Sequence, residues 1–231
     1  MTTNAYNIAV IAGATDNNTA ASIERSQAAA EIGVDGLLLT VPAYNKPTQP
    51  GLVAHFTAIA EATSLPCMLY NVPSRTALNM TATTSIALAE LPNIVGVKEA
   101  SGDLELVAHI IDNTPGDFHV WSGNDGDTLP ILAIGGYGIV SVASHLVGGQ
   151  ISEMINTAVH GNLEGAADIH RRLLPLVDVL FCESNPSPLK FALNELGFRV
   201  GSPRLPLVEV CENSQILIRD ELAKHQIDLP L

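Results

Sequence analysis

The stretch IVGVK at residues 94–98 carries no polar side chain until its last residue, Lys98. Such a run is shorter than a typical buried helix of about ten or more residues and fits a buried strand. A strand that is apolar at consecutive positions is typical of a parallel sheet that is covered on both faces. The stretch therefore predicts a parallel sheet with Lys98 at the carboxyl end of one strand.

Short apolar runs of the same kind recur along the chain and begin about 19 to 30 residues apart, at residues 8–12, 36–41, 66–70, 119–122 and 138–142. Segments with apolar residues at three- and four-residue spacing lie between them, at 19–32, 49–62, 83–91, 104–112 and 151–160. Strands alternating with helices predict an α/β fold with a parallel sheet. The pattern favours a parallel (β/α) barrel of the TIM type, with six of the usual eight β/α units recognisable.

Helical patterns alone follow the last apolar run, at 166–180, 188–196 and 214–225. We therefore expect residues 1–160 to form a truncated (β/α) barrel and residues 161–231 to form a C-terminal helical extension packed on it. A barrel closes only when strand number, tilt and stagger agree, so six strands would leave two open edges. Unpaired edges invite pairing with another chain, which predicts a homo-oligomer.

Composition excludes several classes of function. The chain has 231 residues and a formal net charge of −13, which argues against a nucleic-acid partner. No apolar run approaches the roughly 20 residues needed to span a membrane. Three cysteines without a C-x-x-C pattern indicate reduced thiols and a cytoplasmic location. Histidine spacing offers no metal site, and no glycine-rich loop follows a strand and opens a helix, so no bound cofactor is expected.

Reactive groups in β/α barrels gather at the carboxyl ends of the strands. Lys98 holds such a position, and the apolar surroundings expected there disfavour its ammonium form and make its amine a nucleophile that can form an imine with a ketone. The alternative is that Lys98 pairs with Glu99 or extends to solvent at the rim. Position alone leaves these two interpretations about equally favoured.

Three other side chains follow neighbouring apolar runs. Tyr70 ends the run at 66–70, where a phenol could relay protons; a structural tyrosine is the alternative. Arg75 follows five residues later and could bind a carboxylate with both arms of its guanidinium group, although a solvated arginine is also compatible with a loop. Tyr44 lies near two prolines, and taken alone it is more typical of packing than of chemistry.

Four motifs, at residues 40–47 (TVPAYNKP), 69–76 (LYNVPSRT), 95–102 (VGVKEASG) and 183–190 (ESNPSPLK), closely resemble the dihydrodipicolinate synthase family of pyruvate-dependent class I aldolases, which are related to N-acetylneuraminate lyase. The resemblance implies a Schiff-base lyase that condenses pyruvate with L-aspartate 4-semialdehyde on the route to lysine and diaminopimelate. It assigns the imine to Lys98, proton relay to Tyr70, carboxylate binding to Arg75, a relay role across a dimer interface to Tyr44, and the lining of the pyruvate pocket to Gly123 and Val140.

Two features depart from the family pattern. No G-T-T-G-E motif is recognisable, although its threonines would bind the carboxylate of pyruvate. Ala43 and Ala21 stand where a tyrosine and a glutamate are usual in a lysine-sensing site, so feedback by lysine is not expected. These departures leave two alternatives: a catalytically weak or inactive barrel fragment that acts as a binding or assembly partner, and a related pyruvate lyase or aldolase with another aldehyde.

Overall fold

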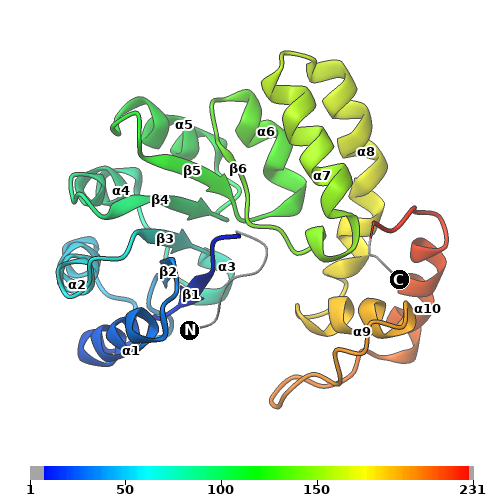
Figure 1. Ribbon diagram of the computed structural model, residues 1–231, viewed down its shortest axis with the longest axis horizontal. Helices are drawn as coiled ribbons and strands as arrows, with labels where there is room; N and C mark the ends of the chain where they lie inside the picture. Colours follow the sequence, from blue (N-terminus) through cyan, green and yellow to red (C-terminus); the bar gives the residue numbers. More distant parts are fainter. Residues whose placement is uncertain (1–7, 229–231) are drawn as a thin grey trace. The chain divides into compact units, whose positions relative to one another are not determined.

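The computed structural model describes residues 8–228, and the chain divides into two compact units (Figure 1). The first unit runs to Asn124 and includes Ile134–Ile139; the second consists of Asp125–Ala133 and the chain from Val140 onward. Each unit is described by itself below. The domain boundary predicted at residue 160 stays a prediction.

A six-stranded parallel sheet forms the centre of the first unit, in the order β1-β2-β3-β4-β5-β6. Its strands are β1 (Ile11–Gly13), β2 (Gly36–Thr40), β3 (Cys67–Asn71), β4 (Ile94–Glu99), β5 (His119–Ser122) and β6 (Gly138–Ile139). Neighbours in space are neighbours in sequence, which is the order of a β/α barrel. The predicted parallel α/β fold with six β/α strands is confirmed.

Four helices of the first unit follow the strands in turn and cover one face of the sheet: α1 (Thr19–Ile32), α2 (Gln49–Glu61), α4 (Ala82–Ala89) and α5 (Leu104–Asp112). Side-chain caps begin them, since Asn18 accepts a hydrogen bond from the Ala21 amide and Asp103 accepts one from the Leu106 amide. Under these helices Leu37, Leu39, Leu69 and Val97 are fully buried. This covered face supplies the apolar core of the unit.

The opposite face of the sheet carries the residues at alternate positions, and it is less covered. Thr40, Tyr70, Lys98 and Trp121 follow one another across neighbouring strands and are all half-buried. The continuous apolar runs are typical of a sheet that is covered on both faces, but this face is covered less completely than the one under the helices. Six strands leave the inner face of the sheet partly accessible, so polar side chains can lie along it.

The second unit is helical. It contains the one-turn 3-10 helix η1 (Asp125–Asp127) and the helices α6 (Thr128–Ala133), α7 (Ser144–Val159), α8 (Leu163–Leu180), α9 (Ser187–Glu195) and α10 (Glu212–Leu222). Helix α7 packs on α8, and α10 packs on both α8 and α9. The three helices predicted after residue 160 are present.

Two boundaries differ from the sequence prediction, and one carboxylate explains both. The last strand was expected at 138–142 but ends at Ile139, and α7 begins at Ser144 instead of 151. The Asp125 carboxylate accepts hydrogen bonds from the backbone amides of Val142, at 3.0 Å, and Ala143, at 3.2 Å. These amides cannot extend the ladder of β6, so the chain turns into a helix earlier than its apolar pattern indicates.

The edge formed by β1 exposes large apolar side chains. Ile8, Val10 and Ile11 are 66%, 50% and 48% exposed, and β1 pairs only with β2 among the described residues. An edge of this kind fits the predicted open sheet. Residues 8–228 contain no helix that is long and apolar enough to cross a bilayer.

Candidate active site

Lys98 and Tyr70 lie side by side at the carboxyl ends of β4 and β3. They are direct partners in the parallel pairing, and the Lys98 Nζ lies 4.2 Å from the centre of the Tyr70 ring. A cation over an aromatic face gains about 0.5–2 kcal/mol, depending on its exposure to solvent. The contact directs the amine toward a phenol, so a nucleophile and a proton donor meet on the accessible face of the sheet.

The carboxylate of Glu99 was the alternative partner that the sequence offered for Lys98. It accepts hydrogen bonds from the Ser101 amide at 2.7 Å and from the Asn71 side chain at 3.0 Å. Because successive side chains of a strand point to opposite faces, Glu99 lies on the helix-covered face and Lys98 on the other. This arrangement favours the interpretation of Lys98 as a nucleophile.

An open cavity of about 260 Å³ lies at the carboxyl ends of β1, β2 and β3. Tyr70 and Arg75 both line it. The remaining lining residues are Val72 and Thr76 on either side of the α3 turn (Pro73–Thr76), Thr40–Ala43 at and after the end of β2, and Thr15, Asp16 and Asn17 from the loop after β1. Small-molecule sites have volumes of about 300–1,000 Å³, and this cavity lies close to the lower limit of that range. Two of the predicted site residues therefore share the wall of one cavity.

Arg75 lies on α3, a single helical turn that the sequence prediction missed because four residues show no periodicity. Burial raises the pKa of the Tyr70 phenol, and the positive charge of Arg75 opposes this rise. Tyr70 is thus held in its protonated form at neutral pH, with a guanidinium group close enough to stabilise a developing phenolate.

Gly123 directly follows β5 and lies beside the side chain of Lys98. A Cβ placed on Gly123 would lie 2.7 Å from the Ala100 Cβ and 3.2 Å from the Lys98 Cε. The Gly123 amide also donates a hydrogen bond to the Glu99 carbonyl at 2.7 Å. The absence of a side chain here gives the lysine stem its space, so the structure brings Lys98, Tyr70 and Gly123 together.

The loop after β1 contributes residues that the sequence analysis overlooked. The Thr15 hydroxyl accepts a hydrogen bond from the Thr40 amide at 2.7 Å, and the Asn17 side chain accepts one from the Ala43 amide at 3.0 Å. The signal was present, because the polar run TDNN at residues 15–18 begins three residues after the end of the first apolar run at 8–12. The same strand-end rule that selected Lys98 would have selected it.

Tyr44 and Val140 do not join this cavity. Tyr44 is 91% exposed, has a left-handed backbone with φ 69°, and lies next to Ala43. Val140 begins the second part of the second unit and precedes the segment whose amides bind Asp125. The roles implied for both residues stay predictions.

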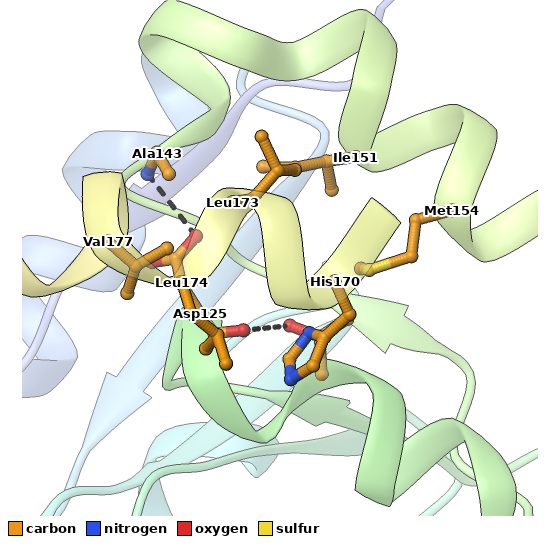
Figure 2. Close-up of a pocket in the computed structure, with 9 residues that line it drawn as sticks. Asp125, Ala143, Ile151, Met154, His170, Leu173, Leu174 and Val177 are labelled. Atoms are coloured by element: carbon orange, nitrogen blue, oxygen red, sulfur yellow. Dashed lines mark hydrogen bonds between the residues drawn. The ribbon is translucent and has the colours of Figure 1, made fainter. Parts of the chain in front are cut away.

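A second, enclosed pocket lies within the helical unit (Figure 2). Its polar lining comes from Asp125, Thr128 and His170, and burial lowers the pKa of the His170 imidazole. Its volume of about 10 Å³ has room for about one water molecule. It has no room for a ketoacid. The open cavity beside Tyr70 is the candidate active site because it lies at the carboxyl ends of the strands and is lined by Tyr70 and Arg75.

Comparison with known proteins agrees with these motifs. Residues 2–225 match the model of the dihydrodipicolinate synthetase family. A 4-hydroxy-tetrahydrodipicolinate synthase of Dehalococcoides mccartyi strain 195 is 59% identical over 222 residues, covering 96% of this chain and 75% of that protein. The enzyme of the same name from Bacillus velezensis is 51% identical over 217 residues, covering 94% of this chain and 75% of that protein.

Solved structures show the same relationship. DHDPS from Cyanidioschyzon merolae, solved with lysine bound, superposes with a TM-score of 0.92 at 50% identity, covering 94% of this chain and 74% of that one. Dihydrodipicolinate synthase from Thermotoga maritima gives a TM-score of 0.92 at 41% identity, covering 94% and 75%. The resemblance inferred from the four motifs is confirmed, and the chain belongs to the dihydrodipicolinate synthetase family.

Proposed function

We propose that the chain is a lyase that condenses pyruvate with L-aspartate 4-semialdehyde through a Schiff base on Lys98, as a 4-hydroxy-tetrahydrodipicolinate synthase in the biosynthesis of lysine and diaminopimelate. The observation that carries the proposal is the placement of the Lys98 amine over the Tyr70 ring, beside a cavity that Tyr70 and Arg75 line. Family membership supports the choice of substrates.

The chemistry follows from an amine next to a phenol. The neutral Lys98 amine attacks the ketone carbon of pyruvate, and loss of water forms the imine. The imine draws electrons from the neighbouring methyl group, which loses a proton to give an enamine. The enamine carbon attacks the aldehyde of the second substrate, whose oxygen takes up a proton. The amino group of that substrate then attacks the re-formed imine carbon, which closes the ring and releases the Lys98 amine. Tyr70 moves protons in these steps, and its raised pKa keeps the phenol protonated until it is needed. No external cofactor enters this scheme.

Arg75 binds the carboxylate of L-aspartate 4-semialdehyde in this proposal. Its position on the cavity wall, near enough to influence Tyr70 electrostatically, supports the assignment. A guanidinium group matches a carboxylate with two parallel hydrogen bonds, which orients the aldehyde as well as binding it. Gly123, beside the Lys98 stem, lines the site for pyruvate in this proposal, and the same role for Val140 rests on the family resemblance alone.

Tyr44 completes the proton relay of a second copy in a homo-oligomer. The 91% exposure of its side chain supports a role toward a neighbouring chain. A cytoplasmic location also belongs to the proposal, and the three free cysteines are compatible with a reducing compartment.

The direct test is chemical trapping. Incubation with pyruvate and borohydride should give one covalent pyruvyl adduct, found by intact mass and located on Lys98 by peptide mapping. The variant Lys98→Arg keeps the charge and should give none, whereas Lys224→Arg, on an exposed side chain of the second unit, should react as the parent chain does. An unmodified parent chain would refute the proposal.

A second candidate is a catalytically weak chain that serves as a binding or assembly partner. The exposed apolar edge of β1 favours it, since such an edge invites another chain. Turnover of both substrates by the purified chain alone, at a rate that does not change when relatives of full length are added, would reject this candidate.

A further inference from the structure

The ends of β3 and β4 carry two pairs of side chains at consecutive positions. Tyr70 pairs in register with Lys98, and Asn71 pairs in register with Glu99. Successive residues of a strand point to opposite faces, so the first pair lies on the accessible face and the second on the helix-covered face. The candidate site therefore has a polar counterpart directly behind it, separated from it by the backbone alone.

Asn71 and Glu99 are buried and saturated with hydrogen bonds. Asn71 is 0% and Glu99 1% exposed. The Asn71 Nδ2 donates to the Glu99 Oε2 at 3.0 Å and to the Oε1 at 3.2 Å, while the Ser101 amide donates to the Oε1 at 2.7 Å. The Asn71 Oδ1 accepts from the Met80 amide at 3.0 Å. The pair thus joins β3, the loop after β4 and the segment that precedes α4.

Burying a carboxyl group in this layer opposes folding. Burial raises the pKa of Glu99, and the hydrogen bonds from Ser101 and Asn71 only partly offset this. Apolar side chains of similar volume often stabilise a fold as well as a buried polar pair does. What a saturated polar pair adds is a single permitted geometry, since any shift leaves a buried group without its partner.

Backbone hydrogen bonds transmit this geometry to the accessible face. The Ala100 amide donates to the Asn71 carbonyl at 2.9 Å, and the Gly123 amide donates to the Glu99 carbonyl at 2.7 Å. Gly123 is the residue whose missing side chain leaves space for the Lys98 stem. Glu99 is therefore linked to β3 through its side chain and to the end of β5 through its carbonyl, on either side of Lys98.

We propose that Asn71 and Glu99 are positioning residues that act through the backbone of β3 and β4 to hold the Lys98 amine against Tyr70. This inference rests on the proposed imine chemistry and extends it to residues that touch neither substrate. The role depends on an amide donor at position 71 that faces a carboxylate acceptor at position 99. The two groups can therefore be exchanged between the two positions.

The test is a swap of the two groups. Asn71→Asp alone would place two carboxyl groups together, and Glu99→Gln alone would place two amides together with their donors opposed. The double variant N71D/E99Q restores a carboxylate opposite an amide, with an acceptor at position 71 for the Met80 amide and one at position 99 for the Ser101 amide. Asn79, whose Oδ1 accepts from Asn71 at 2.7 Å, would turn its amide to donate instead. The Met80 carbonyl, which accepts a long hydrogen bond of 3.4 Å from the Asn71 Nδ2, would lose that donor, so the recovery should be close but incomplete.

A matched control lies at the other end of the same strand. Asn93 precedes β4 and its Nδ2 donates to the carbonyls of Ala60 at 2.9 Å and Thr63 at 3.2 Å. Asn93→Asp should lower the melting temperature, because it turns donors into acceptors facing carbonyls, but it should not slow trapping of pyruvate on Lys98. This variant separates loss of stability from loss of position.

We expect each single swap to slow adduct formation and to lower kcat per folded molecule roughly tenfold or more, since small displacements of a reacting group cost up to a hundredfold. In the double variant, the rate of adduct formation and kcat should return to within about threefold of the parent values. Substitutions at contacting residues are not additive, so the second substitution can reverse most of the effect of the first. Two results would overturn the proposal. One is single variants with a lower melting temperature but unchanged rates of adduct formation and turnover; the other is a double variant whose rates are as low as those of the single variants.

Failure of the proposed function would look different, because the parent chain itself would then form no adduct. Amide hydrogen exchange at Ala100 and Gly123 would still decide whether the pair holds the strand ends. Faster exchange in both single variants with recovery in the double variant supports the positioning role, and unchanged exchange in all three contradicts it.

Discussion

Tyr70 and Lys98 are direct partners in the parallel pairing of β3 with β4, and the Lys98 amine lies 4.2 Å from the centre of the Tyr70 ring. Ring and hydroxyl can therefore be tested separately. Tyr70→Phe keeps the aromatic face that directs the amine and removes the phenol that moves protons. We expect trapping of pyruvate on Lys98 to persist while kcat falls roughly a hundredfold or more. Steady-state kinetics beside intact mass will check this, and an unchanged kcat would remove Tyr70 from the relay.

Arg75→Ala should mainly weaken the binding of the second substrate. Hydrogen bonds to charged groups contribute about 1.5–3 kcal/mol, which corresponds to roughly a tenfold to hundredfold loss in kcat/KM for L-aspartate 4-semialdehyde. The adduct with pyruvate should still form on Lys98, with a smaller change in its rate, because Arg75 acts on this step only through the pKa of Tyr70. Arg204→Ala, on an exposed arginine of the second unit, is the control. If Arg75→Ala spared turnover with another aldehyde while abolishing this one, the related aldolase activity would be favoured.

Gly123→Ala should disturb Lys98 by direct contact. The new methyl group would lie 2.7 Å from the Ala100 Cβ, which is closer than carbon atoms normally approach. Overpacking of this kind costs about 1–3 kcal/mol, and we expect slower imine formation as well as a lower melting temperature. Gly116→Ala has nothing within 4 Å and should change neither quantity. Equal behaviour of the two variants would show that the space at Gly123 is not needed.

The protonation of Glu99 should contribute to the pH dependence of the free energy of unfolding. Burial raises its pKa above the ordinary value of 4.5, so in the interval above that value the folded chain binds more protons than the unfolded chain. The contribution of protonated Glu99 is fully present below about pH 4.5 and is lost as the pH rises through the raised pKa. Glu99→Gln should flatten this decline in the free energy of unfolding, measured by urea titration at several pH values. Parallel curves for both proteins would contradict it.

Two of the three thiols should react quickly. Cys182 and Cys211 are exposed, whereas Cys67 is buried in β3 and burial raises the pKa of its thiol to about 11. A thiolate is the reactive form, so Cys67 should be inert in the folded chain. Titration with a chromogenic disulfide should give two thiols under native conditions and three in denaturant. A third fast thiol without denaturant would mean that β3 opens readily.

The strand pattern of the first unit was predictable because most of its strands lie in apolar runs that recur at regular intervals. The residues at the ends of those runs formed the candidate site. Lys98 and Tyr70 were found in this way, Gly123 followed from the family resemblance, and the three lie together. The loop at Thr15 was equally accessible to that rule and was overlooked.

Other features could not be read from local sequence. The short helix that carries Arg75 has too few residues for a period, and the early end of β6 depends on Asp125, which lies 17 residues before the amide that it binds at Val142. The Asn71–Glu99 pair likewise joins residues 28 positions apart. Such contacts depend on register between distant segments, and periodicity carries no information about register.

The exposed edge at β1 also bears on how the molecule loses its structure. β1 has three residues and one hydrogen-bonded neighbour among the described strands, whereas β3 and β4 each lie between two. Local opening begins where backbone hydrogen bonds are few and exposed, so it should start at the edge strands β1 and β6 and reach β3 and β4 last. Partly opened molecules would keep Lys98 beside Tyr70 after the loop that follows β1 has left the wall of the cavity. Reactivity toward a ketone would then outlast the ability to choose an aldehyde.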